Sequence, residues 1–288
     1  MLETGDGAIV LTHDMIVEGV HYLPGDPAAD VAWKLVAVNL SDLAAKGARP
    51  MGVLLGFTLG DAEWDRAFAD GLGTVLTAFD IPLLGGDTVS APARVLGLTA
   101  IGRAERIPPD RSGARPGHRL WVSGSIGDAG AGLAALRDGS EAPALIERYR
   151  NPRPRLEAGE RLVPLVSAMM DVSDGLLIDS AGMAADLFET YVVTIGVTMV
   201  SIALDAVPLS EAYLACCGEA RRAAVTAGDD YELLFAAPPR HGAAILALSE
   251  ELGLPFTPIG DFAAGSGLGL TESGRPVPLP QRLGFEHG

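Results

Sequence analysis

The sequence RIPPDRSGARPGHR, residues Arg106–Arg119, divides this chain of 288 residues into two parts. The stretch is rich in proline, glycine and charged residues, and its few apolar residues follow no periodic spacing. Because proline and glycine interrupt regular structure, it predicts a connection between domains. Strands and helices mix on both sides of it without strict alternation, which favours two domains of the α+β class. We therefore predict an N-terminal domain at residues 1–115 and a C-terminal domain at residues 116–288.

The N-terminal part carries clear signals for helices. Asp26 and Pro27 precede an apolar stretch that ends before Gly47, which is typical of a helix start and stop. Apolar residues from Trp64 to Leu76 recur at fourfold spacing, as on an amphipathic helix. The predicted helices are Ala28–Lys46 and Asp61–Phe79, and the predicted strands are Ala8–Thr12, Met51–Leu59, Pro82–Leu84 and Val95–Ile101.

The C-terminal part has shorter patterns separated by glycine and proline. The predicted strands are Leu120–Ser123, Ala168–Val172, Val192–Leu204 and Tyr231–Ala236, with a hairpin within Gly267–Pro280. The predicted helices are Ala129–Arg137, Glu157–Pro164, Leu176–Leu187 and Gly242–Leu252.

Composition excludes some classes of partner. The net charge of −16 repels nucleic acid and anionic membranes, so we predict neither as a partner. The longest run without charged residues, Thr190–Leu204, is shorter than the ~18–20 residues that a spanning helix needs. Cys216 and Cys217 are adjacent, which disfavours a disulfide between them. We expect both to be small buried apolar side chains in a reducing compartment, and we predict a cytoplasmic protein without a signal peptide.

Familiar phosphate-binding motifs are missing from the sequence. It has no G-x-x-x-x-G-K-[ST] loop and no H-R-D catalytic loop, and its two lysines are Lys34 and Lys46. Instead, aspartates recur beside Gly, Ser or Thr at expected strand and helix ends; they are Asp14, Asp42, Asp87, Asp171, Asp174 and Asp229. Each alone could be a turn or cap residue, but carboxylates in such positions are good Mg²⁺ ligands.

Two of these contexts leave alternatives open. Asp171 and Asp174 flank Ser173 at a strand end, where they could aim at one cation while Ser173 caps the next helix. Asn39 and Asp42 share one face of a predicted helix, and Asp42 needs either a metal or an arginine partner there.

The turn Gly124–Asp128 links a predicted strand to a predicted helix. Its backbone amides could bind a phosphate, or it could be a plain glycine turn.

Six motifs together resemble the thiamine-monophosphate kinase family of the aminoimidazole ribonucleotide synthetase superfamily. They cover nearly the whole chain and are DMIVEGVHY (14–22), VNLSDLAAKGARP (38–50), LLGGDT (83–88), RSGARPGHRLWVSGSIGDAGAGL (111–133), DVSDGL (171–176) and AGDDYELLF (227–235). The resemblance implies an N-terminal α/β domain that dimerises through its sheet into a barrel, and a C-terminal α/β domain that completes the active site. It also implies ATP-dependent, Mg²⁺-assisted phosphorylation of thiamine monophosphate to thiamine diphosphate by direct transfer. Another ATP-dependent enzyme of the superfamily, or a binding protein without turnover, is the alternative.

The resemblance also implies site residues. The implied magnesium ligands are Thr12, His13, Asp14, Asp42, Asp87, Asp171 and Asp174. The implied nucleotide contacts are Gly86, Asp87, Arg103 and Ser173, and the implied thiamine-monophosphate contacts are His21, Asp229 and Phe285. Asp174, Asp87 and Arg103 are the implied catalytic residues.

The sequence departs from the family pattern at a few positions. The family has a Gly-Asp-Asp-Ala-Ala segment before the first motif, and no counterpart follows Met1, so we expect one metal-binding aspartate fewer here. His13 stands where the family usually has Thr or Ser, and Asp229 where it usually has Glu. Ser180–Ser201 is longer and more apolar than the family pattern.

Overall fold

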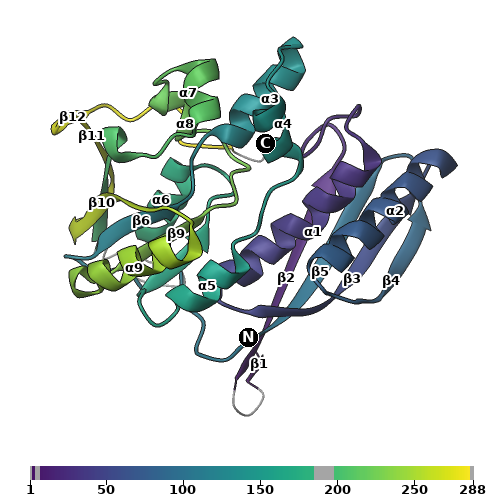
Figure 1. Ribbon diagram of the computed structural model, residues 1–288, viewed down its shortest axis with the longest axis horizontal. Helices are drawn as coiled ribbons and strands as arrows, with labels where there is room; N and C mark the ends of the chain where they lie inside the picture. The colour runs from purple at the N-terminus through teal and green to yellow at the C-terminus, as the bar shows by residue number, and fades with distance from the viewer. Residues whose placement is uncertain (1, 4–6, 185–197, 286–288) are drawn as a thin grey trace, which may run out of the picture.

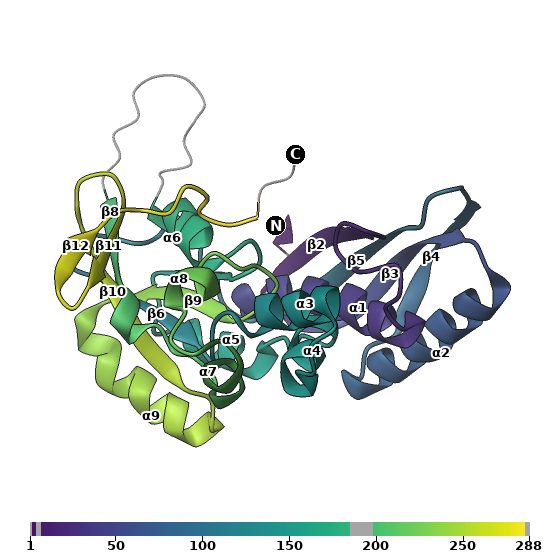
Figure 2. The same cartoon turned by 90° about the horizontal axis from the view of Figure 1, so that it is seen from above.

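The computed structural model describes residues 2–3, 7–184 and 198–285 and has one sheet in each half of the chain (Figure 1). The first sheet has the strand order β1-β2-β5-β3-β4. Its strands are β1 (Leu2–Glu3), β2 (Ala8–Val17), β3 (Arg49–Leu59), β4 (Leu83–Ser90) and β5 (Val95–Ala104). Helices α1 (Ala28–Ala45) and α2 (Ala62–Ala78) cover one face of it (Figure 2).

The second sheet has the order β12-β11-β8-β10-β6-β9-β7. Its strands are β6 (Arg119–Ser123), β7 (Ala168–Asp171), β8 (Thr198–Ala203), β9 (Leu233–Ala237), β10 (Phe256–Ala264), β11 (Gly267–Glu272) and β12 (Arg275–Val277). Its α-helices are α3 (Asp128–Asp138), α4 (Pro143–Arg150), α5 (Leu156–Leu162), α6 (Leu176–Ala184), α7 (Glu211–Cys217), α8 (Arg221–Ala224) and α9 (Gly242–Leu252), with short 3₁₀ turns at Leu204–Ala206 and Pro239–His241. The predicted α+β class is confirmed.

Helix α1 joins the two halves. One stripe of it packs into the core of the first sheet, whereas Ala44 and Ala45 pack with Trp121 and Leu162 of the second half. The indole nitrogen of Trp33 also donates a 2.9 Å hydrogen bond to the carbonyl of Pro152. An element that both cores share can therefore place its polar residues where the two halves meet.

Most predicted elements are present, and some are longer than the sequence indicated. The strand predicted at Pro82–Leu84 extends as β4 to Ser90, and the predicted C-terminal hairpin is β11–β12. Helices α4, α7 and α8 and strand β10 were not predicted. The predictions for 185–187 and 192–197, and most of the unusual stretch Ser180–Ser201, fall outside the described residues.

The expectation that both cysteines are buried was wrong, because Cys216 and Cys217 are free and exposed on α7. Among the described residues, no helix combines the length and hydropathy needed to cross a membrane.

Candidate active site

A cavity of about 680 Å³ lies where the two halves meet, and we call it the junction cavity. Four of the predicted metal ligands line it, namely Asp14, Asp42, Asp171 and Asp174. The other predicted site residues in its wall are His21, Ser173, Asp229 and Phe285. Residues that are as much as 271 positions apart in the sequence, from Asp14 to Phe285, therefore share one site.

Strand β2 presents Thr12 and Asp14 to helix α1. Successive residues of a strand point to opposite faces, and the even-numbered residues of β2 face the helix. The hydroxyl of Thr12 donates a hydrogen bond to the carboxylate of Asp42 on α1. The backbone N–H of Asp14 donates a 3.0 Å hydrogen bond to Oδ1 of Asn39. The strand and the helix thus hold Asp14 and Asp42 on the same side of the sheet.

Asp171 approaches α1 from the other half of the chain. It ends β7 and is buried, and its Oδ2 accepts a 2.5 Å hydrogen bond from the hydroxyl of Ser41. Asp42 has no ion pair with an arginine among the described residues. The arginine alternative for Asp42 therefore has no support in the described part of the chain.

Asp179 on α6 holds the turn that carries Ser173 and Asp174. Its Oδ2 accepts hydrogen bonds of 3.1, 3.2 and 3.1 Å from the backbone N–H groups of Ser173, Asp174 and Gly175. These N–H groups belong to the start of α6, where helix donors otherwise lack partners. Sequence reasoning missed Asp179, although a carboxylate four residues after an Asp-Gly turn is a visible signal.

The carboxylates raise one another's pKa. Burial, followed by the charges of Asp42 and Asp174, raises the pKa of Asp14 to about 6. Burial, followed by the charge of Asp42, raises the pKa of Asp171 well above its usual value. Burial, followed by the charge of Asp174, raises the pKa of Asp179 to about 7. Burial and mutual repulsion therefore disfavour the charged forms of these carboxylates in the protein alone.

Lys46 is a cation whose charge acts on Asp42 of this cluster, and sequence reasoning gave it no role. Burial lowers its pKa, and the charges of Asp110, Asp42 and Asp171 oppose that effect. Its Nζ donates a 3.2 Å hydrogen bond to the carbonyl of Pro109. Lys46 follows Asp42 by four residues, a spacing that places both on one helix face.

The cluster fits divalent cations that are shared with phosphate. Among the described residues, no three His, Cys, Asp or Glu side chains lie close enough together to enclose an ion by themselves. Mg²⁺ usually takes only one or two carboxylates and fills its remaining positions with water and phosphate oxygens. Hard oxygen donors with raised pKa values, such as Asp14 and Asp171, match that chemistry because a bound cation would favour their charged forms.

Asp87 lies away from the junction cavity. It pairs with Gly56 on β3, Gly56 pairs with Gly97 on β5, and Gly97 pairs with Met15 on β2. Paired residues point to the same face, so Asp87 faces the side of the sheet opposite to Asp14. Asp87 is also three strands from β2, about 14 Å at ordinary strand spacing. A single chain therefore does not bring Asp87 and its neighbour Gly86 to the other four aspartates.

Arg103 and His13 also lie apart from the cluster. Arg103 is exposed near the end of β5. Gly97 is the residue of β5 in the same row as Asp87, and Arg103 lies six residues, roughly 20 Å, further along the strand. The Nδ1 atom of His13 lies 2.8 Å from the hydroxyl of Thr99, on the face opposite to helix α1. The side chain of His13 therefore points away from Asp42. The metal-binding role of His13 and the nucleotide-binding and catalytic roles of Arg103 stay predictions.

The turn before α3 is occupied by an internal carboxylate. Oδ2 of Asp230 accepts a 2.8 Å hydrogen bond from the N–H of Gly127, which has a φ of 92°, and Oδ1 accepts a 3.4 Å bond from Ala129. Burial raises the pKa of Asp230 well above its usual value. Because Asp230 already accepts from the N–H groups of Gly127 and Ala129, the plain glycine turn is the alternative that this geometry favours.

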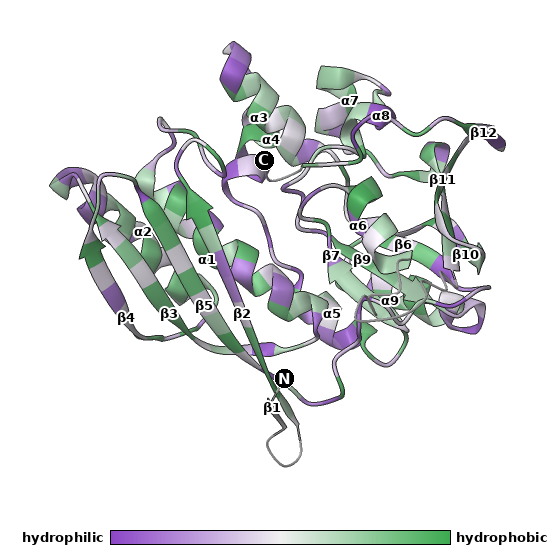
Figure 3. Cartoon of the chain, turned by 180° about the vertical axis from the view of Figure 1, so that it is seen from behind, coloured by the Kyte–Doolittle hydropathy of each residue, from purple (hydrophilic) through white to green (hydrophobic). Residues whose placement is uncertain are grey.

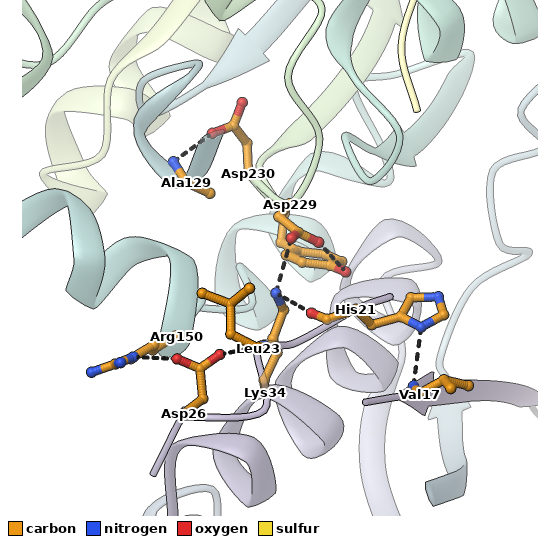
Figure 4. A network of polar contacts seen from close by, with 10 residues as sticks. Val17, His21, Leu23, Asp26, Lys34, Ala129, Arg150, Asp229 and Asp230 are labelled. Atoms are coloured by element: carbon orange, nitrogen blue, oxygen red, sulfur yellow. Dashed lines mark hydrogen bonds and ion pairs between the residues drawn. The ribbon is translucent and has the colours of Figure 1, made fainter. Parts of the chain in front are cut away.

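The segment around Asp229 has an uncommon backbone. Asp229 and Tyr231 have φ values of 70° and 50°, which side-chain-bearing residues rarely adopt. Hydrogen bonds of 2.8 Å, from the N–H of Asp229 to Ser173 and from the N–H of Tyr231 to Val172, hold this conformation. Strained residues of this kind persist where the surroundings fix them, often at ligand sites. Figure 4 shows the Asp229 carboxylate beside the ammonium group of Lys34, and the hydroxyl of Tyr231 donates a hydrogen bond to the same carboxylate.

Known proteins match the chain over nearly its full length. Residues 1–104 match the family "AIR synthase related protein, N-terminal domain", and residues 115–272 match the corresponding C-terminal domain. The thiamine-monophosphate kinase of Salmonella typhimurium is 36% identical, over 97% of this chain and 86% of that protein.

Solved structures agree. The thiamine-monophosphate kinase of Stenotrophomonas maltophilia has a TM-score of 0.84 and 36% identity, covering 96% of this chain and 88% of that one. AaThiL complexed with AMPPCP and TMP has a TM-score of 0.83 and 27% identity, covering 99% and 89%. On this identity and coverage, the chain belongs to the thiamine-monophosphate kinase family.

Proposed function

We propose that the junction cavity binds thiamine monophosphate and the triphosphate of ATP and transfers the γ-phosphoryl group to give thiamine diphosphate and ADP. The observation that carries the proposal is the convergence of Asp14 and Asp42 from one half with Asp171 and Asp174 from the other. The solved relative complexed with AMPPCP and TMP supports the choice of both substrates.

The chemistry needs positioning rather than a base. A phosphate oxygen of thiamine monophosphate, already anionic near neutral pH, forms a bond to the γ-phosphorus as the bond to the oxygen of ADP breaks. Because no proton has to be removed from the nucleophile, the reaction needs no histidine or glutamate as a general base. Catalysis in such transfers comes mainly from alignment and from charge stabilisation in the transition state.

The acidic residues have a role that follows from their charge. Asp14, Asp42, Asp171 and Asp174 would hold Mg²⁺, which neutralises the phosphate oxygens of both substrates. Thr12 orients Asp42, Ser41 orients Asp171, and Asp179 fixes the turn of Asp174. At the same cavity His21, Asp229 and Phe285 would bind the thiamine part, and Ser173 the nucleotide.

We further propose that the protein works as a homodimer. Helices α1 and α2 leave one face of the first sheet uncovered, and we call it the open face. Figure 3 shows this sheet with hydrophobic stretches in green along β2, β3 and β5. Leu11, Met15, Leu54 and Leu84 there are 50%, 52%, 39% and 54% exposed. A contiguous apolar face of this kind favours burial against another protein surface. Pairing of two open faces agrees with the barrel that the family resemblance implies.

The homodimer also gives a role to the residues that lie outside the cavity. Gly86 and Asp87 are on β4 and Asp87 points to the open face, so only another chain can bring them near a cluster like that of Asp14. We propose that Gly86, Asp87 and Arg103 contact nucleotide or Mg²⁺ in the assembled dimer. A reducing, cytoplasmic location completes the proposal, because exposed free thiols such as Cys216 and Cys217 fit such a compartment.

The test is release of ADP from ATP in a coupled assay, with thiamine monophosphate and with or without Mg²⁺. We expect turnover that needs both, with thiamine diphosphate as the product by chromatography. Thiamine without its phosphate is the control acceptor and should support no turnover. Binding of thiamine monophosphate without ADP release would favour the binding protein, and turnover with a different acceptor would favour another enzyme of the superfamily.

A further inference from the structure

A buried lysine stands directly behind the wall of the junction cavity. Lys34 lies on α1 with 2% of its surface exposed. Its Nζ donates a 2.9 Å hydrogen bond to Oδ2 of Asp229 and a 3.0 Å bond to the carbonyl of His21. The same ammonium group lies 3.9 Å from the centre of the Tyr149 ring. All of these contacts stabilise its charge away from water.

The two acceptors belong to different walls of the cavity. His21 follows β2 in the first half, whereas Asp229 precedes β9 in the second half, 195 positions after Lys34. Both line the junction cavity, but Lys34 is not among the residues that do. The ammonium group of Lys34 therefore fixes the spacing of two residues that line the junction cavity, although Lys34 itself does not line it.

The carboxylate of Asp229 is held at both oxygens. Oδ2 accepts from Lys34, and Oδ1 accepts a 3.2 Å hydrogen bond from the hydroxyl of Tyr231. A carboxylate oxygen can accept two hydrogen bonds, so each one keeps a position for a donor on the ligand. The backbone N–H bond from Asp229 to Ser173 fixes the main chain as well.

Helix α1 connects this arrangement to the acidic cluster. Lys34, Val38 and Asp42 follow one another at fourfold spacing, and Val38 and Asp42 line the cavity. Eight residues of helix separate Lys34 from Asp42 by about 12 Å. Displacing Lys34 would thus move Asp229 relative to the phosphate-binding end of the cavity.

We propose that Lys34 is a positioning residue for the thiamine part of thiamine monophosphate, acting through Asp229 and the loop of His21. The proposal rests on the proposed function. It adds to the same cavity a residue that lies behind the wall and acts on the ligand through its neighbours. A bare structural role explains the geometry less well, because a buried ion pair adds little net stability compared with an apolar pair. In this arrangement Lys34 presents the carboxylate of Asp229 to the cationic, hydrogen-bond-donating rings of the substrate.

The test compares Lys34→Met, Lys34→Arg, Asp229→Asn and the double variant Lys34→Met/Asp229→Asn. For Lys34→Met we expect the KM for thiamine monophosphate to rise about tenfold, with the KM for ATP within about twofold. Lys34→Arg should restore most of this loss because it keeps the charge. The double variant should be no worse than Asp229→Asn, since residues that act through one contact are not additive.

Arg150→Met is the matched control. It breaks a partly buried ion pair, Arg150 Nε to Asp26 Oδ1 at 2.8 Å, that joins the two halves away from the cavity wall. We expect this variant to have a lower thermal midpoint. Its KM for thiamine monophosphate and its KM for ATP should change by the same factor, if they change at all. Lys34→Gln, which keeps one donor, replaces Lys34→Met if that variant does not fold.

Two results would overturn the inference: equal changes in both KM values for Lys34 variants, or additive losses in the double variant. Absence of turnover in the unmodified protein would instead reject the proposed function.

Discussion

The hydroxyl of Ser41 donates a 2.5 Å hydrogen bond to Asp171, although the two residues are 130 positions apart and come from different halves of the chain. Both side chains are buried. The hydrogen bond favours the charged carboxylate, whereas burial and the charge of Asp42 raise the pKa of Asp171. The contact therefore favours the ionised form of Asp171, a proposed metal ligand, at the junction of the two halves.

Ser41→Ala should weaken the response to Mg²⁺. Without the hydroxyl the pKa of Asp171 rises further, and loss of the hydrogen bond costs about 1–3 kcal/mol of the free energy of unfolding. We expect a higher Mg²⁺ concentration for half-maximal activity, measured by ADP release. Ser125→Ala is the control, because Ser125 donates a comparable 2.7 Å hydrogen bond to Asp128. It should lower stability and leave the Mg²⁺ dependence unchanged; the same Mg²⁺ shift in both variants would contradict the prediction.

Asp174→Asn should abolish turnover while the fold stays intact. The substitution keeps the shape of the side chain and removes a charge that acts on both Asp14 and Asp179. We expect a loss of at least about 100-fold in kcat, the scale on which a transition-state charge contact acts.

The thermal midpoint of the metal-free Asp174→Asn protein should stay the same or rise, because repulsion among the carboxylates decreases. Asp261→Asn, at a side chain that is 74% exposed, is the control and should keep full activity. An Asp174→Asn protein with normal activity would remove Asp174 from the mechanism.

The stability of the metal-free protein should fall as pH rises from about 4 to about 7. The pKa of Asp14 rises from 3.8 unfolded to about 6 folded, and that of Asp179 to about 7, chiefly through burial. Between about pH 4 and pH 7 the folded protein therefore binds more protons than the unfolded protein. The contribution of these two groups to the free energy of unfolding is present below about pH 4 and is lost above their folded pKa values.

Mg²⁺ should reverse that loss, because it favours the charged carboxylates. The rise in thermal midpoint on adding Mg²⁺ should therefore be larger at pH 8 than at pH 5. At each pH the thermal midpoint is measured with and without Mg²⁺, and the two values are subtracted. The subtraction cancels the effect of groups that titrate far from the cavity. An equal rise at both pH values would count against metal binding by Asp14 and its neighbours.

The sequence predicted the aspartates of the site better than their arrangement. Asp14, Asp171 and Asp174 stand in turn contexts beside small residues, which local patterns detect. Which face of a sheet a residue such as Asp87 takes depends on strand pairing, and no local pattern reports it.

Two other features escaped sequence reasoning for physical reasons. Strand β10 contains Pro258, which argues against a central strand, and the structure accommodates it with a register shift between Pro258 and Gly260. Sequence reasoning gave Lys34 no role, because its partner Asp229 is 195 positions away and no local pattern connects them.

The protein should be a dimer in solution, and charge on the open face should dissociate it. Leu54 and Leu84 are 39% and 54% exposed there, and burying them in a dimer removes apolar surface from water. The double variant Leu54→Asp/Leu84→Asp would place two unpaired carboxylates per chain in the interface. Burying unpaired charges costs more free energy than the apolar contacts of the interface supply, so the dimer should dissociate.

We expect light scattering coupled to gel filtration to give twice the chain mass of 29.8 kDa for the unmodified protein and the single mass for the variant. Activity should fall in parallel, because Asp87 can reach the cluster of another chain only in the dimer. Leu246→Asp on α9, at a residue that is 49% exposed on the other half of the chain, should remain dimeric and active. A monomeric variant with full activity would show that Asp87 takes no part in the reaction, and a monomeric unmodified protein would reject the proposed dimer.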